Sequence, residues 1–212
     1  MMAVDGAALR GMVAEIAAAM EANKDELCRL DGLIGDADHG IAMALGFGAA
    51  RDAVDALGPE AEPTAVLNTA AKAFLNAVGA SSGPLYATAL MRAGAAVKGK
   101  PALDDDDVVA LLQAMATGIR DRGKAEPGDK TMLDAWAPAA EAAAAARAAG
   151  RDRAACLDAA EAAARAGAEA TRDMTAAKGR AERLGQRALG HVDPGAASAV
   201  IAIAAMRRAL AS

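Results

Sequence analysis

The chain has 212 residues, of which 54% are hydrophobic and only 2% aromatic, with a formal net charge of −5 and a sequence pI near 5.1. Its length suits one well-cored domain over residues 1–212, and its acidic balance argues against a broad nucleic-acid-binding or anionic-membrane-binding surface. Abundant alanine and leucine with few β-branched runs predict an all-α protein.

Cysteine usage and the N-terminal segment bear on the compartment. Cys28 and Cys156 are isolated and form no CxxC pair, so neither a zinc site nor a disulfide framework is expected. Residues 1–20 lack the continuous apolar stretch of a signal peptide, and the alanine-rich stretches are interrupted by charges. We therefore expect a cytoplasmic protein that does not span a membrane.

Apolar residues at helical spacing predict eight helices joined mostly by short turns. Thr64, Asp129 and Asp193 are expected as N-caps of the third, sixth and eighth helices. The expected helices cover about 6–29, 40–57, 65–78, 84–97, 104–119, 130–149, 152–177 and 194–211.

Four irregular loops follow the odd-numbered helices of this scheme. They span residues 30–40, 79–83, 122–130 and 178–195. Because consecutive helices with short connections run antiparallel, all four loops are expected at the same end of the helical assembly. The sequence therefore predicts a single site there.

The first of these loops gathers carboxylates. Asp31, Asp36 and Asp38 fall within eight residues, and glycines at positions 32, 35 and 40 are expected to break regular structure. Their oxygens suit one or two Mg²⁺ ions, although turn aspartates that cap local amides would give the same composition. The spacing is not that of a calcium EF-hand loop.

The other loops have features of phosphate binding. Residues 79–83 place glycines and two hydroxyls before a helix, where backbone N–H groups bind phosphate well. Both histidines lie in these loops, and we expect them to act as phosphate-contacting donors rather than bases. The loop residues expected to contact phosphate by charge or as donors are Lys124, Lys130, Arg180, Arg187, His39 and His191.

A second acidic run, residues 104–107, stands at the start of the fifth expected helix. Four consecutive aspartates could form another metal cluster. Helix capping and the favourable interaction of carboxylates with a helix N-terminus explain such a run equally simply, so we favour capping.

With these residues assembled, the chain resembles the nucleotide-binding L subunits of dihydroxyacetone kinases over essentially its full length. The resemblance rests on four segments in order: Leu30-Asp31 with residues 35–40, then residues 79–85, 122–132, and 179–196. It implies an eight-helix antiparallel up-and-down barrel with the nucleotide site in loops at one end.

The resemblance also implies site residues. Asp31, Asp36 and Asp38 would hold two Mg²⁺ ions on the phosphates of ADP or ATP, and Arg180 and Lys130 would stabilise charge on the transferred group. The residues expected to line the nucleotide are His39, Gly40, Ser81, Ser82, Gly123, Met132, Arg180, Asp193, Pro194 and Gly195.

Two branches of the family differ in the phosphoryl donor. In one, a phosphohistidine protein of the sugar phosphotransferase system rephosphorylates tightly held ADP, and the phosphoryl group passes to dihydroxyacetone on a separate K subunit. The free-standing chain and His39 favour this branch, because ATP-dependent members usually carry cysteine there. Members of this branch can also contact a transcription regulator, and a homodimer is compatible with the sequence.

Three alternatives stay open at this point. One is the nucleotide subunit of an ATP-dependent triose or tetrulose kinase. The second is a nucleotide-loaded regulatory protein without turnover, and the third is a carboxylate-metal hydrolase of similar shape.

Overall fold

The computed structural model describes residues 3–79 and 82–211 of the chain. Within these residues the protein is all-α, as predicted, apart from one pair of two-residue strands. The helices are α1 Gly6–Ala22, α2 Lys24–Ile34, α3 His39–Asp55, α4 Pro63–Ala77, α5 Ser82–Ala96, α6 Asp105–Gly123, α7 Leu133–Ala148, α8 Arg153–Ala170 and α9 Pro194–Leu210. The strands are β1 Val4–Asp5 and β2 Ala102–Leu103, and the 3₁₀ segments are η1 Thr171–Asp173 and η2 Arg180–Ala188.

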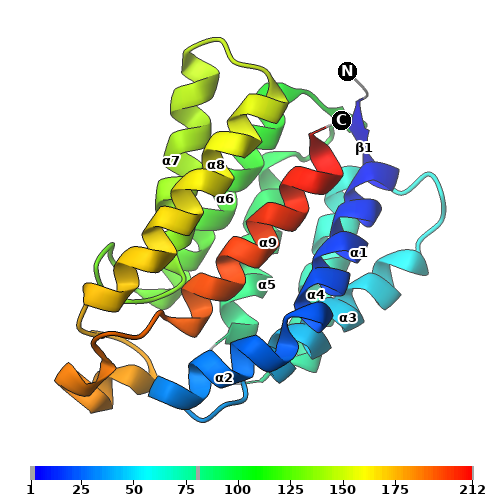
Figure 1. Cartoon of the computed structure of the whole chain (residues 1–212). Coiled ribbons are helices and arrows are strands. Elements are labelled where there is room, and N and C mark those ends of the chain that lie inside the picture. Colours follow the sequence, from blue (N-terminus) through cyan, green and yellow to red (C-terminus); the bar gives the residue numbers. More distant parts are fainter. Residues whose placement is uncertain (1–2, 80–81, 212) are drawn as a thin grey trace.

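The long helices pack in sequence order (Figure 1). From α3 to α9 each helix lies against the next, and α1 packs against both α3 and α9. Strand β1 pairs antiparallel with β2, with Val4 opposite Leu103, which ties the start of the chain to the connection before α6. In Figure 1, α2 and the orange η2 segment lie at the lower end of the molecule, and β1 lies at the upper end with the end of α9.

The four aromatic residues of the chain form one cluster in the core. Phe47 stacks edge-on against Phe74 and Tyr86 with ring centroids 4.9 and 5.3 Å apart, and Tyr86 lies 6.5 Å from Trp136. All four side chains are at most 2% exposed. Because many other interior positions are alanine, these rings supply much of the volume that fills the centre of the bundle.

The first expected helix is in fact two. Helix α1 ends at Ala22 and α2 begins at Lys24, and the side chain of Asn23 donates to the carbonyl of Ala19, a bond that competes with continuation of the helix. Helix α2 then continues to Ile34, so Asp31 lies on a helix rather than in a loop. The expected loop 30–40 shrinks to residues 35–38, because Gly32 costs a helix only about 1 kcal/mol and packing can outweigh that.

Two expected N-caps are wrong and one is confirmed. Pro63 starts α4, and the Thr64 hydroxyl, instead of capping, is placed to donate to the carbonyls of Gly94 in α5 and of Val97 just after it. Helix α7 starts only at Leu133, after a turn in which the carboxylate of Asp134 accepts backbone N–H groups, so Asp129 does not cap it. Asp193 caps α9 as predicted, accepting from the N–H of Ala196 at 2.8 Å.

The segment between α8 and α9 is also more structured than expected. Helix α8 stops at Ala170 rather than Ala177, and residues 180–188 form the 3₁₀ segment η2. Its Ala181 and Ala188 pack with Ile34 of α2 in a small apolar cluster separate from the main core. This cluster fixes η2 against the end of α2.

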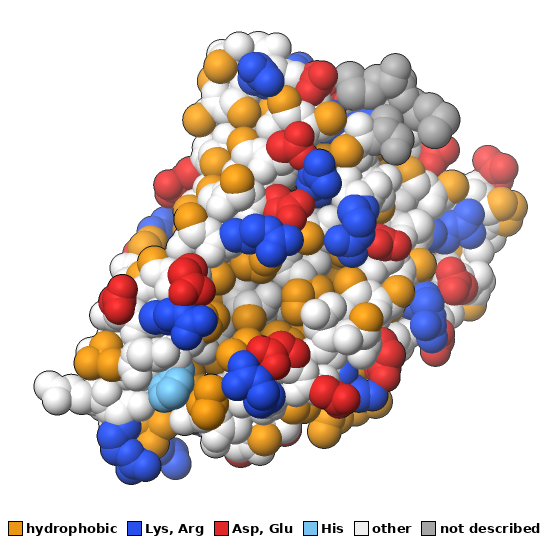
Figure 2. Space-filling model, in the orientation of Figure 1, with side chains coloured by type: hydrophobic (Ala, Val, Ile, Leu, Met, Phe, Trp, Pro, Cys, Tyr) orange, Lys and Arg blue, Asp and Glu red, His pale blue; other side chains and the backbone are white. Residues whose placement is uncertain are grey.

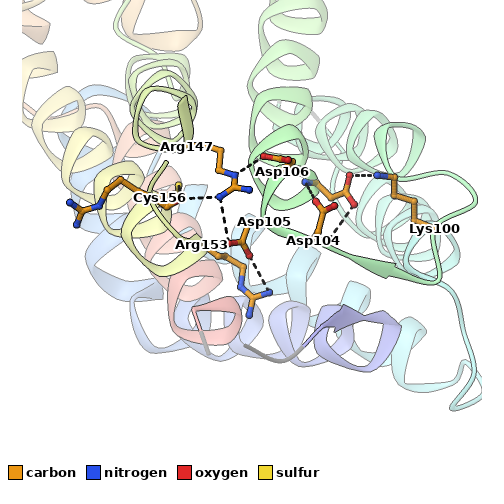
Figure 3. Close-up of polar contacts among 9 residues, drawn as sticks. Lys100, Asp104, Asp105, Asp106, Arg147, Arg153 and Cys156 are labelled. Atoms are coloured by element: carbon orange, nitrogen blue, oxygen red, sulfur yellow. Dashed lines mark hydrogen bonds and ion pairs between the residues drawn. The ribbon is translucent and has the colours of Figure 1, made fainter. Parts of the chain in front are cut away.

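The aspartates of residues 104–107 cap α6 and form ion pairs with neighbouring segments, at the end of the bundle that carries β2 (Figure 3). Asp104 accepts from the N–H of Asp107, and Asp107 accepts in return from the N–H of Asp104, which forms a reciprocal capping box. Lys100 pairs with Asp107, and Arg147 of α7 pairs with Asp106 at 2.5 Å. These bonds support the capping interpretation of this run.

The face in Figure 2 carries acidic and basic side chains side by side. Arg208 of α9 pairs with Glu15 of α1 at 2.7 Å, and Arg207 pairs with Asp158 of α8. These ion pairs link α9 to α1 and α8. Among residues 3–79 and 82–211, no helix is both long enough and apolar enough to cross a membrane.

Candidate functional site

A cavity of about 710 Å³ lies at the end of the bundle where α3, α5, α7 and α9 begin. All four irregular loops contribute to its wall, so they lie together as the helix count predicted. The expected site residues that line it are Asp31, Asp36, Asp38, His39, Ser82, Gly123, Lys130, Met132, Arg180, Asp193, Pro194 and Gly195.

Four helix N-termini converge on this cavity. His39, Ser82 and Pro194 are the first residues of α3, α5 and α9, and Met132 directly precedes α7. The first turn of each helix carries N–H groups without intrahelical partners and the positive end of the helix dipole. The arrangement therefore favours an anion with several acceptor oxygens.

Three carboxylates stand at one side of the cavity. Asp31, Asp36 and Asp38 each offer an oxygen, and these oxygens lie within 4.8 Å of one another. Asp31 is 8% exposed, and its Oδ2 accepts from the N–H groups of Asp38 and His39 at 2.9 and 3.2 Å. Those bonds orient the Asp31 carboxylate on the start of α3.

The short connection between α2 and α3 is shaped around Asp31. A Cβ on Gly35 would lie 2.1 Å from Asp31 Oδ1, so only glycine leaves room for the carboxylate. Ala37 has a φ of 63°, a left-handed conformation that non-glycine residues adopt rarely and at a cost. The backbone thus accepts strain where it places Asp36 and Asp38 beside Asp31, and the oxygen set fits a hard divalent cation.

Arg180 faces these carboxylates from η2. Its guanidinium forms an ion pair with Asp36 and lies 3.9 Å from Asp38. The side chain is 56% exposed, so only the pairing and the apolar contacts of η2 fix its place. Arg180 is therefore a cation at the edge of the cavity that partly offsets the acidic cluster.

His39 is held from the core side. Its Nε2 lies 2.9 Å from the hydroxyl of Ser198 on α9, and that hydroxyl lies 3.5 Å from the Tyr86 hydroxyl. Burial lowers the pKa of His39, with a smaller opposing effect from Asp31. Ser198 and Tyr86 were not predicted as site residues, since a serine among the alanines of α9 gives no sequence signal.

Lys130 and Asp193 are buried in the wall of the cavity. The Lys130 ammonium donates to the carbonyls of Thr171 and His191 at 2.5 and 2.6 Å, and burial lowers its pKa. Burial has the opposite effect on an acid and raises the pKa of Asp193 to about 7, although the Ala196 N–H and Lys130 oppose the shift. Lys130 thus links the segment after α8 to the segment before α9. Direct contact of Lys130 with a phosphate stays a prediction.

Several expected site residues are placed elsewhere or lie outside the description. Gly40 does not line the cavity: it packs on α2, where a Cβ would stand 1.9 Å from the carbonyl of Lys24. Lys124, Arg187 and His191 are also outside the lining. Ser81 lies outside the described residues.

An apolar wall completes the cavity and was not predicted. Ile41 and Leu45 lie one helical turn apart on α3 and line it, although they are 49% and 59% exposed. Leu85 of α5 lines it as well. Exposed apolar residues beside polar loops are a signal of ligand or partner contact, and the motifs of charged and glycine residues do not include them.

A family model described as the DAK2 domain matches residues 33–208. The chain belongs to the DAK2 domain family. This match includes every residue that lines the cavity except Asp31, which lies two residues before it.

DAK2 relatives of known name cover most of the chain. It is 38% identical over 196 residues to the "PEP-dependent dihydroxyacetone kinase 2, ADP-binding subunit DhaL" of Listeria innocua, covering 92% of this chain and 90% of that one. The Escherichia coli ADP-binding subunit DhaL is also 38% identical, over 81% of each chain. The L-erythrulose 1-kinase of Mycolicibacterium smegmatis is 38% identical over 83% of this chain, which spans only 31% of that protein.

Solved structures support the same DAK2 fold. The native dihydroxyacetone kinase of C. freundii superposes with a TM-score of 0.72 at 26% identity, over 95% of this chain and 34% of that one. The same kinase in complex with AMP-PNP and Mg²⁺ gives a TM-score of 0.74 at 24% identity, which bears on the fold alone. The chain thus spans about a third of that longer kinase.

Proposed function

We propose that this DAK2 protein is the ADP-binding subunit of a PEP-dependent dihydroxyacetone kinase. In this role it receives a phosphoryl group from a phosphohistidine donor protein on bound ADP and passes it to dihydroxyacetone held on a separate K subunit. The protein is a phosphotransferase subunit that turns over only with its partners. It acts in the cytoplasm as a single domain.

One observation carries the proposal: three clustered carboxylates and the N-termini of four helices face one cavity of about 710 Å³. Relatives that match this chain over most of their own length are named ADP-binding subunits. A nucleoside diphosphate with its cation needs both features, since the helix termini suit phosphate oxygens and the carboxylates suit the metal. The apolar wall of Ile41, Leu45 and Leu85 offers a surface for the base.

Asp31, Asp36 and Asp38 would hold the metal, which we propose to be two Mg²⁺ ions. Two such ions carry +4 against −3 from the carboxylates, and the surplus favours a diphosphate. Bound Mg²⁺ supplies neutralisation of phosphate charge. The proposed nucleotide contacts are His39, Ser81, Ser82, Gly123, Met132, Arg180, Asp193, Pro194 and Gly195.

The chain's own contribution is positioning and charge. The N–H groups at the helix starts hold phosphate oxygens in place, and Arg180 stands at the cavity edge where it can meet the transferred group. No nucleophile on this chain is needed. We further propose that α1 and α3 to α9 form a closed antiparallel up-and-down barrel, with α2 as an extension of α1, supported by the contact of α9 with α1.

A second candidate is the nucleotide domain of an ATP-dependent tetrulose kinase. It is favoured by the L-erythrulose 1-kinase of M. smegmatis, which is as similar in identity, 38%, as the ADP-binding subunits. The two proposals differ in the donor. Rapid exchange of bound ADP for free ATP is expected of the second and not of the first.

The deciding experiment uses the purified full-length chain. Its bound nucleotide is identified after denaturation, and ³¹P NMR then follows whether a phosphohistidine donor or ATP supplies a phosphoryl group to dihydroxyacetone with a K subunit present. Transfer from the donor alone supports the first proposal. Transfer from ATP alone overturns it, tight ADP without transfer indicates a regulatory protein, and nucleotide hydrolysis without partners indicates a hydrolase.

A further inference from the structure

Ser198 is a fully buried hydroxyl that joins two sides of the cavity. Its Oγ lies 2.9 Å from the carbonyl of Gly195, one turn back on α9, and 2.9 Å from Nε2 of His39, the first residue of α3. Both His39 and Gly195 line the cavity, whereas Ser198 stands behind them at 0% exposure. The serine therefore couples the N-termini of α3 and α9.

The direction of these bonds limits the state of His39. A hydroxyl has a single proton, and a carbonyl can only accept, so the 2.9 Å contact with Gly195 is a hydrogen bond only when Ser198 donates that proton to it. The remaining lone pairs of Oγ must accept, so the bond with His39 needs a proton on Nε2. In a neutral imidazole only one nitrogen carries a proton, which leaves Nδ1 as an acceptor.

The second donor of His39 is also in use. Its backbone N–H lies 3.2 Å from Oδ2 of Asp31, in the bond that orients this carboxylate. Both N–H groups of His39 thus point to protein oxygens, one on Ser198 and one on Asp31. A phosphate oxygen needs a donor, and the neutral residue has none left to offer.

We propose that Ser198 is a positioning residue that holds His39 with its proton on Nε2, so that His39 meets the bound ligand as a hydrogen-bond acceptor. The group that it recognises is then a hydroxyl or a water molecule, and not a phosphate oxygen. This rests on the proposed nucleotide site for the nature of the ligand, and it replaces the expectation that the His39 side chain donates to phosphate. Tyr86, 3.5 Å behind Ser198, limits the rotation of the serine side chain from the core side.

The test reads the tautomer directly. The chain contains only two histidines, His39 and His191, so long-range ¹H–¹⁵N correlation spectra of ¹⁵N-histidine-labelled protein resolve both rings. Spectra are recorded at pH 8 on the full-length chain without nucleotide, and a His191→Gln variant assigns the signals. We expect His39 to carry its proton on Nε2; a proton on Nδ1 in the unsubstituted protein overturns the proposal.

Three variants separate positioning from packing. Ser198→Ala should give a mixture of tautomers and lower Mg²⁺-dependent ADP affinity about three- to tenfold, the usual effect of one lost hydrogen bond. Ser198→Thr keeps the hydroxyl and should restore both properties. Thr64→Ala is the matched control, because it removes a hydroxyl that bonds carbonyls at the end of α5 and just after it, and that does not line the cavity.

An unchanged tautomer in Ser198→Ala overturns the proposal whatever happens to affinity. Equal loss in Ser198→Ala and Thr64→Ala does so too, since it indicates a general effect of stability. Failure of the unsubstituted chain to bind ADP counts against the proposed function instead, and the tautomer measurement does not depend on it.

Discussion

Two acidic clusters lie at opposite ends of the bundle, and they differ in what surrounds each carboxylate. Residues 104–107 supply a reciprocal capping box and pair with the neighbouring cations Lys100 and Arg147 (Figure 3). Asp31, Asp36 and Asp38 instead bring three oxygens within 4.8 Å of one another on the wall of a cavity. Both places are rich in aspartate, so it is their different surroundings that support the proposal of a cation site at the cavity cluster.

Backbone geometry sharpens the contrast. Asp104 and the first turn of α6 form a standard helix start, in which the carboxylates pair with a nearby N–H group or a cation. The connection before α3 contains Ala37 at a φ of 63° and a glycine whose Cβ would collide with Asp31. Strain of this kind persists where packing or function requires it. Here the strained backbone brings three negatively charged carboxylates close together.

The largest expected effect separates the two clusters by substitution. Asp36→Asn removes one carboxylate from the cavity cluster, and we expect Mg²⁺-dependent ADP affinity to fall by about 100-fold or more, because changes even behind the ligands of a metal cost about 10- to 100-fold. Asp38→Asn should behave alike. The melting temperature should change little, since both side chains are exposed.

The matched control for this prediction is Asp106→Asn in the other cluster. It makes the same chemical change in an exposed aspartate that pairs with Arg147. Isothermal titration should show unchanged ADP affinity in this variant. Equal affinities in Asp36→Asn and the unsubstituted protein would defeat the assignment of the cavity cluster to a metal.

The N-caps of α9 and α6 offer a second comparison, through pH. Asp193 is buried with a pKa of about 7, above its ordinary 3.8, so the folded state retains a proton that the unfolded state has lost. Stability from this group is fully present below about pH 4 and is lost as pH rises through 7, by up to about 4 kcal/mol. Asp193→Asn keeps the capping oxygen and should flatten this part of the stability profile.

Urea unfolding from pH 4 to pH 8 measures the free energy of unfolding of Asp193→Asn and of the unsubstituted protein. The difference between the two values cancels the contribution of groups that titrate alike in both. As pH rises, Asp193→Asn should become progressively more stable relative to the unsubstituted protein. A constant difference would mean that Asp193 is ionised in the folded state over this whole range.

A smaller effect is expected at the exposed cap. Asp104→Ala removes the N-cap of α6 and should lower stability by about 1 kcal/mol, or a melting temperature by about 2–4 °C. Asp104→Ser, which can still accept from the N–H of Asp107, should recover most of it. ADP affinity should stay unchanged in both variants, and a loss of affinity would show that the two ends are coupled.

The sequence predicted the helical class and the convergence of the loops because both follow from local patterns. Apolar spacing marked the long helices, and the Asp193-Pro194 pair marked the start of α9. Capping chemistry likewise accounted for residues 104–107.

Other features depend on contacts between distant segments and have no local signature. The helical face of α1 continues across Asn23, so the break between α1 and α2 was missed. Gly32 and Gly40 were expected in a loop, yet one lies inside α2 and the other allows α3 to approach α2. Ser198 looks like any small residue of an alanine-rich helix until α3 is placed beside it.

Arg180 gives the last and smallest test of the comparison. It forms an ion pair with Asp36 in the cavity cluster, as Arg147 does with Asp106 at the other end of the bundle. Asp36 is also a proposed metal ligand, so the Arg180 guanidinium and a divalent ion compete for the same carboxylate. Arg180→Ala should therefore raise the Mg²⁺ or Mn²⁺ affinity of the nucleotide-free chain by about two- to fivefold, the modest gain expected from an exposed ion pair.

With the nucleotide and partners present, the same substitution should slow phosphoryl transfer, since Arg180 then faces the phosphates instead of the carboxylates. Arg183→Ala, an equal change of charge on an exposed residue of η2 outside the cavity lining, is the control and should affect neither property. Mn²⁺ titration followed by electron paramagnetic resonance measures the first effect. Weaker metal binding in Arg180→Ala than in Arg183→Ala would mean that Arg180 shapes the carboxylate cluster for the ion rather than competing with it.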